Sequence, residues 1–227
     1  MDSAERPKSM PPPLFPQWSN GLLRWGMVGA TGMVLFVPCL LMGMTRSPVV
    51  TGQYQVVEQP VEFDHRHHVS DLGIDCLYCH AGAERSAYAG VPPTSLCMNC
   101  HNQVWDRAGA LAPVRRSYAE DQPIRWRRVH ALPDFVFFNH AAHVTRGVGC
   151  LSCHGQVGEM ARVYQVAPLN MAWCIDCHRH PASALRPGEF ITEEAWAPTA
   201  REQERIGSEL VVAHAINPPL TCSGCHR

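Results

Sequence analysis

The chain has 227 residues, with 19 lysines and arginines against 20 aspartates and glutamates, which leaves a formal net charge of −1 at pH 7. This length suits one domain of ordinary size, or one domain together with a short additional segment. A net charge so close to zero gives no basis for nucleic-acid binding, so no nucleic-acid partner is expected. Cysteine is the informative count, because the chain has eleven of them and ten recur in one spacing.

The N-terminal part of the chain is expected to anchor it in a membrane. Residues 1–20 are polar and proline-rich and predict a cytoplasmic tail. Residues 21–45 predict a transmembrane signal-anchor helix, because the stretch from Trp25 to Met44 contains no charged side chain and is long enough to cross a bilayer. A cleaved signal peptide is the alternative, but its apolar region is usually shorter, and the sequence has no convincing small-residue cleavage site.

The orientation of this anchor follows from the charges beside it. Arg6, Lys8 and Arg24 precede the apolar stretch, which favours a cytoplasmic N-terminus. Residues 46–227 are then expected to form one domain on the periplasmic side of a bacterial cytoplasmic membrane.

Five Cys-x-x-Cys-His motifs follow in this domain. In such a motif two thiols form thioethers with the two vinyl groups of one haem, and the histidine is the proximal iron ligand. The sequence therefore predicts five haem c groups, attached outside the cytoplasm. The attachment residues are Cys76 and Cys79, Cys97 and Cys100, Cys150 and Cys153, Cys174 and Cys177, and Cys222 and Cys225, with His80, His101, His154, His178 and His226 as proximal ligands.

Other uses of paired cysteines explain these motifs less well. Structural zinc takes four ligands from two cysteine pairs, so five pairs leave one pair without a partner. Disulfides suit an exported chain but do not account for the five histidines. A thioredoxin-like redox centre needs a βαβ pattern around one motif, and none is visible.

A pair of histidines precedes the first motif and another precedes the third. The pattern Phe-x-His-x-x-His occurs in residues 63–68 and again in residues 138–143. Residues three apart on a helical turn share a face at different heights, so each pair reaches two irons. We therefore expect four distal ligands, which are His65, His68, His140 and His143. Each pair is followed by two motifs, which makes residues 63–101 and 138–178 an internal repeat.

The residue patterns leave the fifth distal ligand open. Methionine also ligates haem iron, although core packing is the role that we favour for the methionines of this region. The candidates are His67, His130, His180, His214, Met160 and Met171.

The expected fold class is mainly α with long loops and little β structure, in which a multihaem core made largely of porphyrin is joined to the N-terminal transmembrane helix. Residues 107–124 show little periodicity and predict a surface loop. The cations of residues 125–130 suit either haem propionates or a solvated basic face. Thr199 and Glu202 form a capping box that predicts the start of a short helix.

The Phe-x-His-x-x-His device resembles that of small multihaem cytochromes of the c3 and c7 kind. The whole arrangement resembles something narrower, the membrane-anchored pentahaem cytochrome c subunit of bacterial alternative complex III, a quinol-oxidising assembly. One N-terminal span, five motifs and the segments VHALPDFVFFNHAAHVTRGVGCLSCHG and MAWCIDCHR carry this resemblance, which is most specific over residues 129–179. It implies bis-histidine haems, with His130 as the fifth distal ligand. His214 is the alternative candidate for this ligand.

The resemblance also implies the function. Such a subunit is an electron carrier, not itself an enzyme, and relays electrons from a quinol-oxidising membrane module and an iron–sulfur, molybdopterin-like subunit to a monohaem cytochrome c or a soluble periplasmic acceptor. We expect the haem attached at Cys222 and Cys225 to lie at one end of this relay.

Two other functions compete with it. A stand-alone quinol dehydrogenase of the NapC/NrfH type usually has its first motif close to the membrane, whereas about thirty residues separate Met44 from Cys76 here. A multihaem enzyme such as a nitrite reductase needs an iron with an open position, which the number of histidines neither requires nor excludes.

Overall fold

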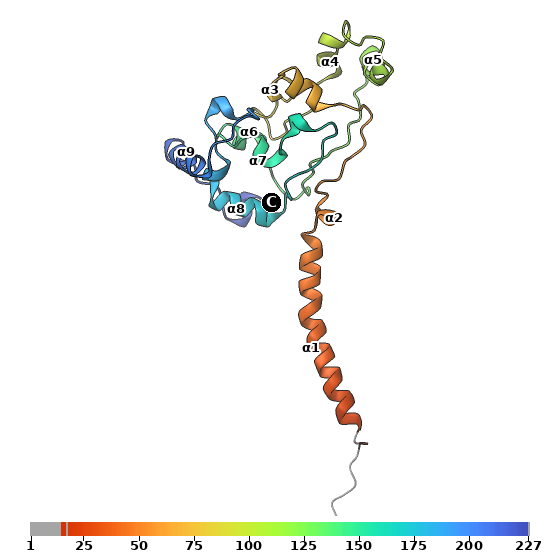
Figure 1. The fold of residues 1–227 in the computed structure, drawn as a ribbon, viewed down its shortest axis with the longest axis vertical. Helices are drawn as coiled ribbons and strands as arrows, with labels where there is room; N and C mark the ends of the chain where they lie inside the picture. The colour runs from red at the N-terminus through yellow and green to blue at the C-terminus, as the bar shows by residue number, and fades with distance from the viewer. Residues whose placement is uncertain (1–14, 17, 227) are drawn as a thin grey trace, which may run out of the picture. The chain divides into compact units, whose positions relative to one another are not determined.

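A computed structural model describes residues 15, 16 and 18–226, drawn as a ribbon in Figure 1. The chain divides into two compact units, Met1–Ser47 and Pro48–Arg227. Most of the predicted N-terminal tail, residues 1–20, lies outside the described residues.

The described part of the first unit consists mainly of one helix, α1 (Trp18–Thr45). It begins before the predicted start at residue 21, because Ser19 closes the first turn by donating to the carbonyl of Pro16 (2.7 Å). The charge-free stretch Trp25–Met44 is about 30 Å long at 1.5 Å per residue, which matches the hydrocarbon core of a bilayer. Among the described residues, α1 is the one helix long and apolar enough to cross a membrane.

The second unit is built from short helices joined by long loops, as the sequence predicts. Its longest helix has 14 residues. The elements are α2 (Pro48–Thr51), η1 (Arg66–Asp71), α3 (Cys76–Cys79), α4 (Thr94–His101), η2 (Gly109–Leu111), α5 (Ala112–Glu120), α6 (His140–Val144), α7 (Leu151–His154), η3 (Val157–Glu159), α8 (Met171–Arg179), η4 (Pro181–Ala184), η5 (Gly188–Phe190), α9 (Ala200–Ala213) and η6 (Cys222–Gly224). The described residues contain isolated β-bridges but no strand, which confirms the predicted fold class.

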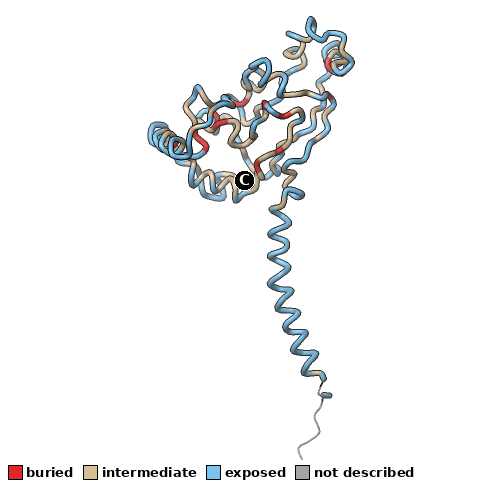
Figure 2. Tube along the Cα trace, in the orientation of Figure 1, coloured by how far each residue is buried: buried red, intermediate tan, exposed pale blue. Residues whose placement is uncertain are grey.

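Few described residues of the second unit are buried, as the colours of the Cα trace in Figure 2 show. Within the described residues, Leu185 alone has a side chain less than 2% exposed. The buried apolar residues are Val61, Ala83, Val114, Val144, Met160, Ala167, Ala184 and Leu185. Such sparse apolar packing agrees with the expectation that porphyrin forms most of the core.

The prediction of a surface loop over residues 107–124 is wrong, because η2 and α5 occupy this segment. Pro113 lies in the first turn of α5, where proline favours a helix start. Buried Val114 and Ser117 face inward from α5, and the Ser117 hydroxyl is hydrogen-bonded to that of Thr94 on α4 (2.7 Å). Two buried positions in one short helix are too few to produce a visible periodicity.

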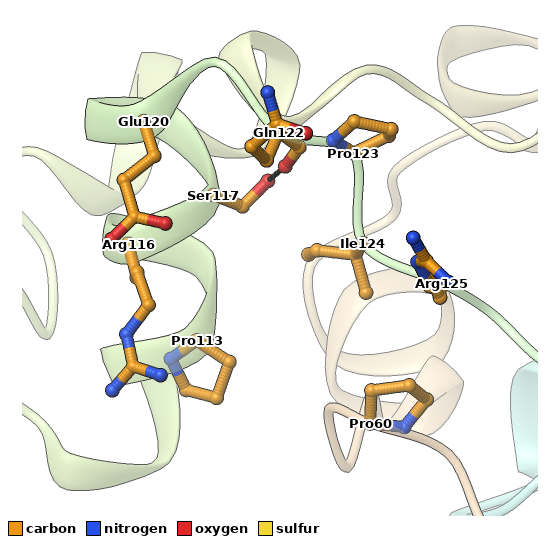
Figure 3. Close-up of a pocket in the computed structure, with 9 residues that line it drawn as sticks. All are labelled: Pro60, Pro113, Arg116, Ser117, Glu120, Gln122, Pro123, Ile124 and Arg125. Carbon is orange, nitrogen blue, oxygen red and sulfur yellow. Dashed lines mark hydrogen bonds between the residues drawn. The ribbon is translucent and has the colours of Figure 1, made fainter.

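A shallow cleft lies beside α5, between this helix and the chain that leaves it. Figure 3 shows its lining, in which Pro60 and Ile124 face Pro113 across the cleft. The Ser117 hydroxyl donates to the carbonyl of Gln122 and so fixes the returning chain. The cleft holds no cysteine or histidine of the motifs.

Helix α9 begins at the predicted capping box. The Thr199 hydroxyl accepts a hydrogen bond from the backbone N–H of Glu202, whose carboxylate accepts one from the backbone N–H of Thr199. Farther along α9, Gln203 donates to the carbonyls of Ala182 and Leu185 (2.9 and 2.7 Å). Helix α9 therefore holds the segment that follows the fourth motif.

Candidate haem-binding sites

Each Cys-x-x-Cys-His motif lies on or beside one helical turn. In chain order these turns are α3, α4, α7, α8 and η6. Side chains cap two of them, because Asp75 accepts from the backbone N–H of Leu77 (2.8 Å) and Asn170 accepts from that of Trp173 (3.0 Å). Cysteines three apart on such a turn present both thiols on one face, as attachment to a single porphyrin requires.

The motif cysteines carry free thiols. All eleven cysteines of the chain are among the described residues, and all are free. Cys100 and Cys222 are exposed, and the other eight motif cysteines are half-buried. Burial raises the pKa of Cys153 to about 12. The motifs therefore offer the thiols that thioether formation consumes.

A backbone carbonyl holds the imidazole in four of the five motif histidines. The Nδ1–O distances are 2.7 Å from His80 to Gly90, 3.0 Å from His101 to Val104, 2.8 Å from His178 to Pro219, and 3.3 Å from His226 to Phe135. A carbonyl oxygen only accepts, so Nδ1 donates its proton and Nε2 keeps a lone pair. This is the tautomer that ligates a metal through Nε2.

Three histidines of the pairs at η1 and α6 are held by the same kind of hydrogen bond, from Nδ1 to a backbone carbonyl. Nδ1 lies 2.9 Å from the carbonyl oxygen of Asp64 in His68, 3.0 Å from that of Ala87 in His140, and 2.8 Å from that of Asn139 in His143. His65 differs, because its Nδ1 is buried without a hydrogen-bond partner. Burial, with a smaller effect of His80, lowers the pKa of His65 to about 4, so this imidazole is neutral at pH 7.

Three histidines of these pairs face a motif histidine at one common distance. The ring centroids are 6.2 Å apart for His68 and His101, 6.4 Å for His140 and His154, and 6.2 Å for His143 and His178. A metal–nitrogen bond is about 2 Å long, so two imidazoles that ligate one ion from opposite sides have centroids about 6 Å apart. The spacing of all three pairs therefore fits an iron between the rings.

A phenylalanine packs against both imidazoles of each histidine pair. Phe63 stacks on His68 (4.3 Å, 24°) and meets His65 edge-on (4.7 Å, 81°). Phe138 repeats this geometry with His143 (4.5 Å, 27°) and His140 (4.7 Å, 88°). The sequence does mark these two phenylalanines, because phenylalanine is the first residue of both Phe-x-His-x-x-His segments.

His130 lies beside the third motif. Its ring centroid is 4.4 Å from that of His154, which is too close for an iron between the two rings. His130 Nε2 is buried without a hydrogen-bond partner, and burial lowers the pKa of this imidazole. Among the described residues, no hydrogen bond or ring contact joins His130 to His226.

The other candidate ligands have different surroundings. His67 lies 3.4 Å from the Asp71 carboxylate and stacks on Trp105, and exposed His180 lies 3.5 Å from that of Asp176. The carbonyl of exposed His214 accepts from Arg146 (3.1 Å). Met160 is buried, whereas Met171 is 61% exposed.

Haem is the group that this donor set fits. Paired thiols on helical turns, Nε2 atoms left with lone pairs and imidazole rings about 6 Å apart together suit covalently attached, six-coordinate haem. A mainly helical fold with a sparse apolar core and an N-terminal apolar helix completes an arrangement typical of a membrane-anchored multihaem cytochrome c.

The chain is similar to a named protein of this class. It is 37% identical over 102 residues to the multihaem cytochrome c subunit of menaquinone reductase from Nitratidesulfovibrio vulgaris strain Hildenborough. The match covers 44% of this chain and 48% of that protein, so the chain spans about half the length of the curated relative it matches. No protein-family model matches the chain.

Proposed function

We propose that residues 46–227 carry five covalently bound haem c groups. Bound haem supplies one-electron redox chemistry at its iron. The attachment residues are the ten motif cysteines, the proximal ligands are His80, His101, His154, His178 and His226, and the distal ligands are His65, His68, His140 and His143. The fifth distal ligand is His130, which the resemblance alone supports. The chain holds most of these imidazoles in their ligating tautomer through backbone carbonyls.

The chain transfers electrons and has no catalytic residue of its own. The spacing of the three imidazole pairs carries this conclusion, because an iron with two strong ligands has no position left for a substrate. A multihaem enzyme needs one such open position. The contacts of the second, third and fourth motifs do not favour an open position at any of these three irons.

The chain is a subunit of a membrane-bound quinone oxidoreductase. Helix α1 supports the membrane attachment, and the similarity to a subunit of menaquinone reductase supports a quinone-linked partner. The partners are integral membrane quinol-binding subunits, an iron–sulfur, molybdopterin-like subunit and a monohaem cytochrome c, as in alternative complex III. Residues 1–20 face the cytoplasm, residues 21–45 span the membrane, and the haem domain lies on the periplasmic side.

Haem content and quinol reduction of the purified full-length chain test this proposal. The ratio of haem to protein should be five, and dithionite should reduce all of it. Menaquinol should not reduce the isolated chain, because in the proposed complex a partner subunit oxidises the quinol and passes the electrons to this chain. Restored reduction upon addition of the partner subunits is the positive control.

The competing function is a stand-alone quinol dehydrogenase of the NapC/NrfH type, which the single anchor α1 also suits. Rapid reduction of the isolated chain by menaquinol would establish this alternative in place of the subunit function. A ratio of haem to protein below five would instead count against the assignment of all five motifs as haem attachment sites.

A further inference from the structure

The two halves of the internal repeat carry opposite charges ahead of their first attachment cysteine. Residues 63–76, which end at Cys76, contain three aspartates and one arginine, a net charge of −2 with neutral histidines. Residues 138–150, which end at Cys150, contain one arginine and no acidic residue, a net charge of +1. The first and third motifs are therefore entered by segments of opposite sign.

The backbone before these two cysteines is nevertheless similar. Gly73 and Gly147 each precede their cysteine by three residues, and both have a positive φ, of 66° and 91°. This is the left-handed region that favours glycine. Asp75 and Gly149 hold corresponding positions, directly before Cys76 and Cys150. The charge at this position thus differs between two motifs that the chain approaches through the same kind of turn.

The carboxylate of Asp75 lies beside the first motif. It accepts hydrogen bonds from the backbone N–H of Leu77 (2.8 Å) and from the hydroxyl of Thr192 (2.6 Å). Both donors are uncharged, and no ion pair among the described residues includes Asp75. No cation therefore neutralises this carboxylate next to Cys76.

The guanidinium of Arg186 takes the corresponding place beside the third motif. Gly149 is buried, and a Cβ built on it would lie 2.5 Å from Nε and 3.2 Å from Cζ of Arg186. Arg186 Nη1 donates to the carbonyls of Glu193 (2.8 Å) and Phe190 (3.4 Å), and its backbone N–H donates to the carbonyl of Gly147 (2.7 Å). Uncharged acceptors therefore hold this half-buried cation against the residue before Cys150.

The acidic side chains that follow Arg186 have other partners. The Glu193 carboxylate accepts from the backbone N–H of Ala195 (3.0 Å). The Glu194 carboxylate accepts from the backbone N–H of Gly158 in η3 (2.6 Å), and the carbonyl of Gly158 accepts from Ser70 (2.6 Å). No ion pair among the described residues includes Arg186, so its charge is not cancelled either.

Residues 191 and 192 fix both motifs with respect to these charges. The backbone N–H of Cys150 donates to the carbonyl of Ile191 (3.0 Å), and the Cys76 thiol approaches the carbonyl of Thr192 (4.0 Å). Thr192 also holds Asp75 through its hydroxyl. One short segment thus braces the first motif with its carboxylate and the third motif with its guanidinium.

We propose that Arg186 raises the reduction potential of the haem attached at Cys150 and that Asp75 lowers that of the haem attached at Cys76, so that the third haem has the higher potential. A positive charge stabilises an added electron, and a negative charge opposes it. The proposal rests on the proposed function, because it needs haem at both motifs, and adds the residues that set the two potentials apart. Reduction adds one electron from an electrode to a ferric haem, with no bond formed or broken.

A spectroelectrochemical titration of the full-length holoprotein tests the two residues. His140→Met makes the third haem titrate apart from the others, because methionine ligation raises its potential, and His65→Met does the same for the first haem. Arg186→Gln is then measured in the His140→Met background, and Asp75→Asn is measured in the His65→Met background. The potential of the tagged haem is followed by its absorbance.

The two substitutions should act in opposite directions. Arg186→Gln should lower the ratio of reduced to oxidised third haem at a fixed potential about tenfold, or about 59 mV, because this charge is partly buried. Asp75→Asn should raise the ratio for the first haem about threefold, a smaller change because water screens an exposed carboxylate. The tagged third haem should titrate above the tagged first haem.

Two control variants separate charge from packing. Arg186→Lys keeps the positive charge but loses the planar fork, so it should change the ratio less than about twofold. If Arg186 only braced the chain, the lysine and glutamine variants would shift the potential alike. Arg205→Gln removes an arginine that pairs with Glu209 at the surface of α9 (2.8 Å) and should leave both potentials unchanged.

An unchanged third haem in Arg186→Gln, an equal shift in Arg186→Lys, or a tagged first haem above the tagged third would overturn the proposal. If a tagged variant fails to fold, the untagged protein decides, because one of its five potentials should fall in Arg186→Gln and one should rise in Asp75→Asn. The haem-to-protein ratio is measured as well. A ratio below five in the unaltered protein contradicts the proposed function, whereas a ratio of five without these shifts contradicts this proposal alone.

Discussion

At the scale of single residues, the backbone determines which imidazole nitrogen is available to a metal. Seven of the ten proposed ligands place Nδ1 within 3.3 Å of a carbonyl oxygen. The carbonyl accepts the Nδ1 proton and leaves Nε2 free. His67 and His180 place Nδ1 beside a carboxylate instead, at the surface. The carbonyl partner thus distinguishes these seven histidines from solvent-exposed His67 and His180.

His68→Met tests this separation. Methionine in place of a histidine ligand raises the haem potential, by a fraction of the ~0.8 V range that axial ligands cover. One of the five haems should therefore titrate at a higher potential in a spectroelectrochemical titration. His67→Met is the matched control, and a comparable shift in that variant would show that the surroundings do not identify the ligands.

Phe138→Leu tests the orienting role of the phenylalanine beside the second histidine pair. Loss of the stack on His143 should lower the free energy of unfolding by about 0.5–1.5 kcal/mol beyond the loss of buried area. It should also change the electron paramagnetic resonance signal of one ferric haem, because the ligand plane is freer to rotate.

Phe190→Leu is the control for this change. Phe190 stacks on Trp196 at 4.4 Å and has no ring contact with a histidine among the described residues. The Phe190→Leu variant should lose a similar free energy of unfolding and leave the electron paramagnetic resonance signals unchanged. An unchanged signal in Phe138→Leu would mean that the ring packs against the imidazoles without orienting them.

At the scale of elements, short helices depend on a few tight contacts because they have little apolar area to bury. Gly207 of α9 packs directly on the backbone of Ala182 in η4. A Cβ at Gly207 would overlap that backbone, which a side-chain rotation does not relieve. The contact between α9 and η4 therefore requires glycine at this position.

Gly207→Ala should destabilise the protein by about 1–3 kcal/mol, as expected for overpacking. The change in the free energy of unfolding is measured by denaturant titration of the holoprotein, followed by circular dichroism. Gly188→Ala is the control, since a Cβ there meets nothing within 4 Å. Equal stability of the two variants would show that α9 moves away from η4 at little cost.

At the scale of the whole molecule, the arrangement favours carrying electrons over binding substrates. In three of the five proposed sites, two imidazoles already face each other at 6.2–6.4 Å. A protein in which every iron has two strong ligands should be inert to small gaseous ligands.

Carbon monoxide tests this property of the whole molecule. The dithionite-reduced protein should keep its absorption spectrum under carbon monoxide, because each of the five irons has two histidine ligands in the arrangement that we propose. His143→Ala should open one site and bind about one equivalent of carbon monoxide per chain, since one iron then lacks its distal ligand. Binding to the unaltered protein would reveal an open haem and favour the multihaem-enzyme alternative.

Much of the site could be predicted because its chemistry is local. Attachment of one haem fixes the spacing of two cysteines and a histidine, and this spacing is visible in the sequence whatever the rest of the fold. The pairs on η1 and α6 are visible for the same reason, since three residues make about one helical turn. Helix α5 could not be predicted, because its packing on α4 through Ser117 and Thr94 leaves no periodic pattern.

The sequence by itself determined the motifs, the anchor, the fold class and the pairs of histidines, all of which depend on residues close together in the chain. Only the tertiary structure decided which imidazole faces which and where His130 lies. These depend on contacts such as that of His140 with the carbonyl of Ala87, between residues far apart in the sequence. Spacing along the chain fixes local chemistry, but packing alone brings distant segments to one site.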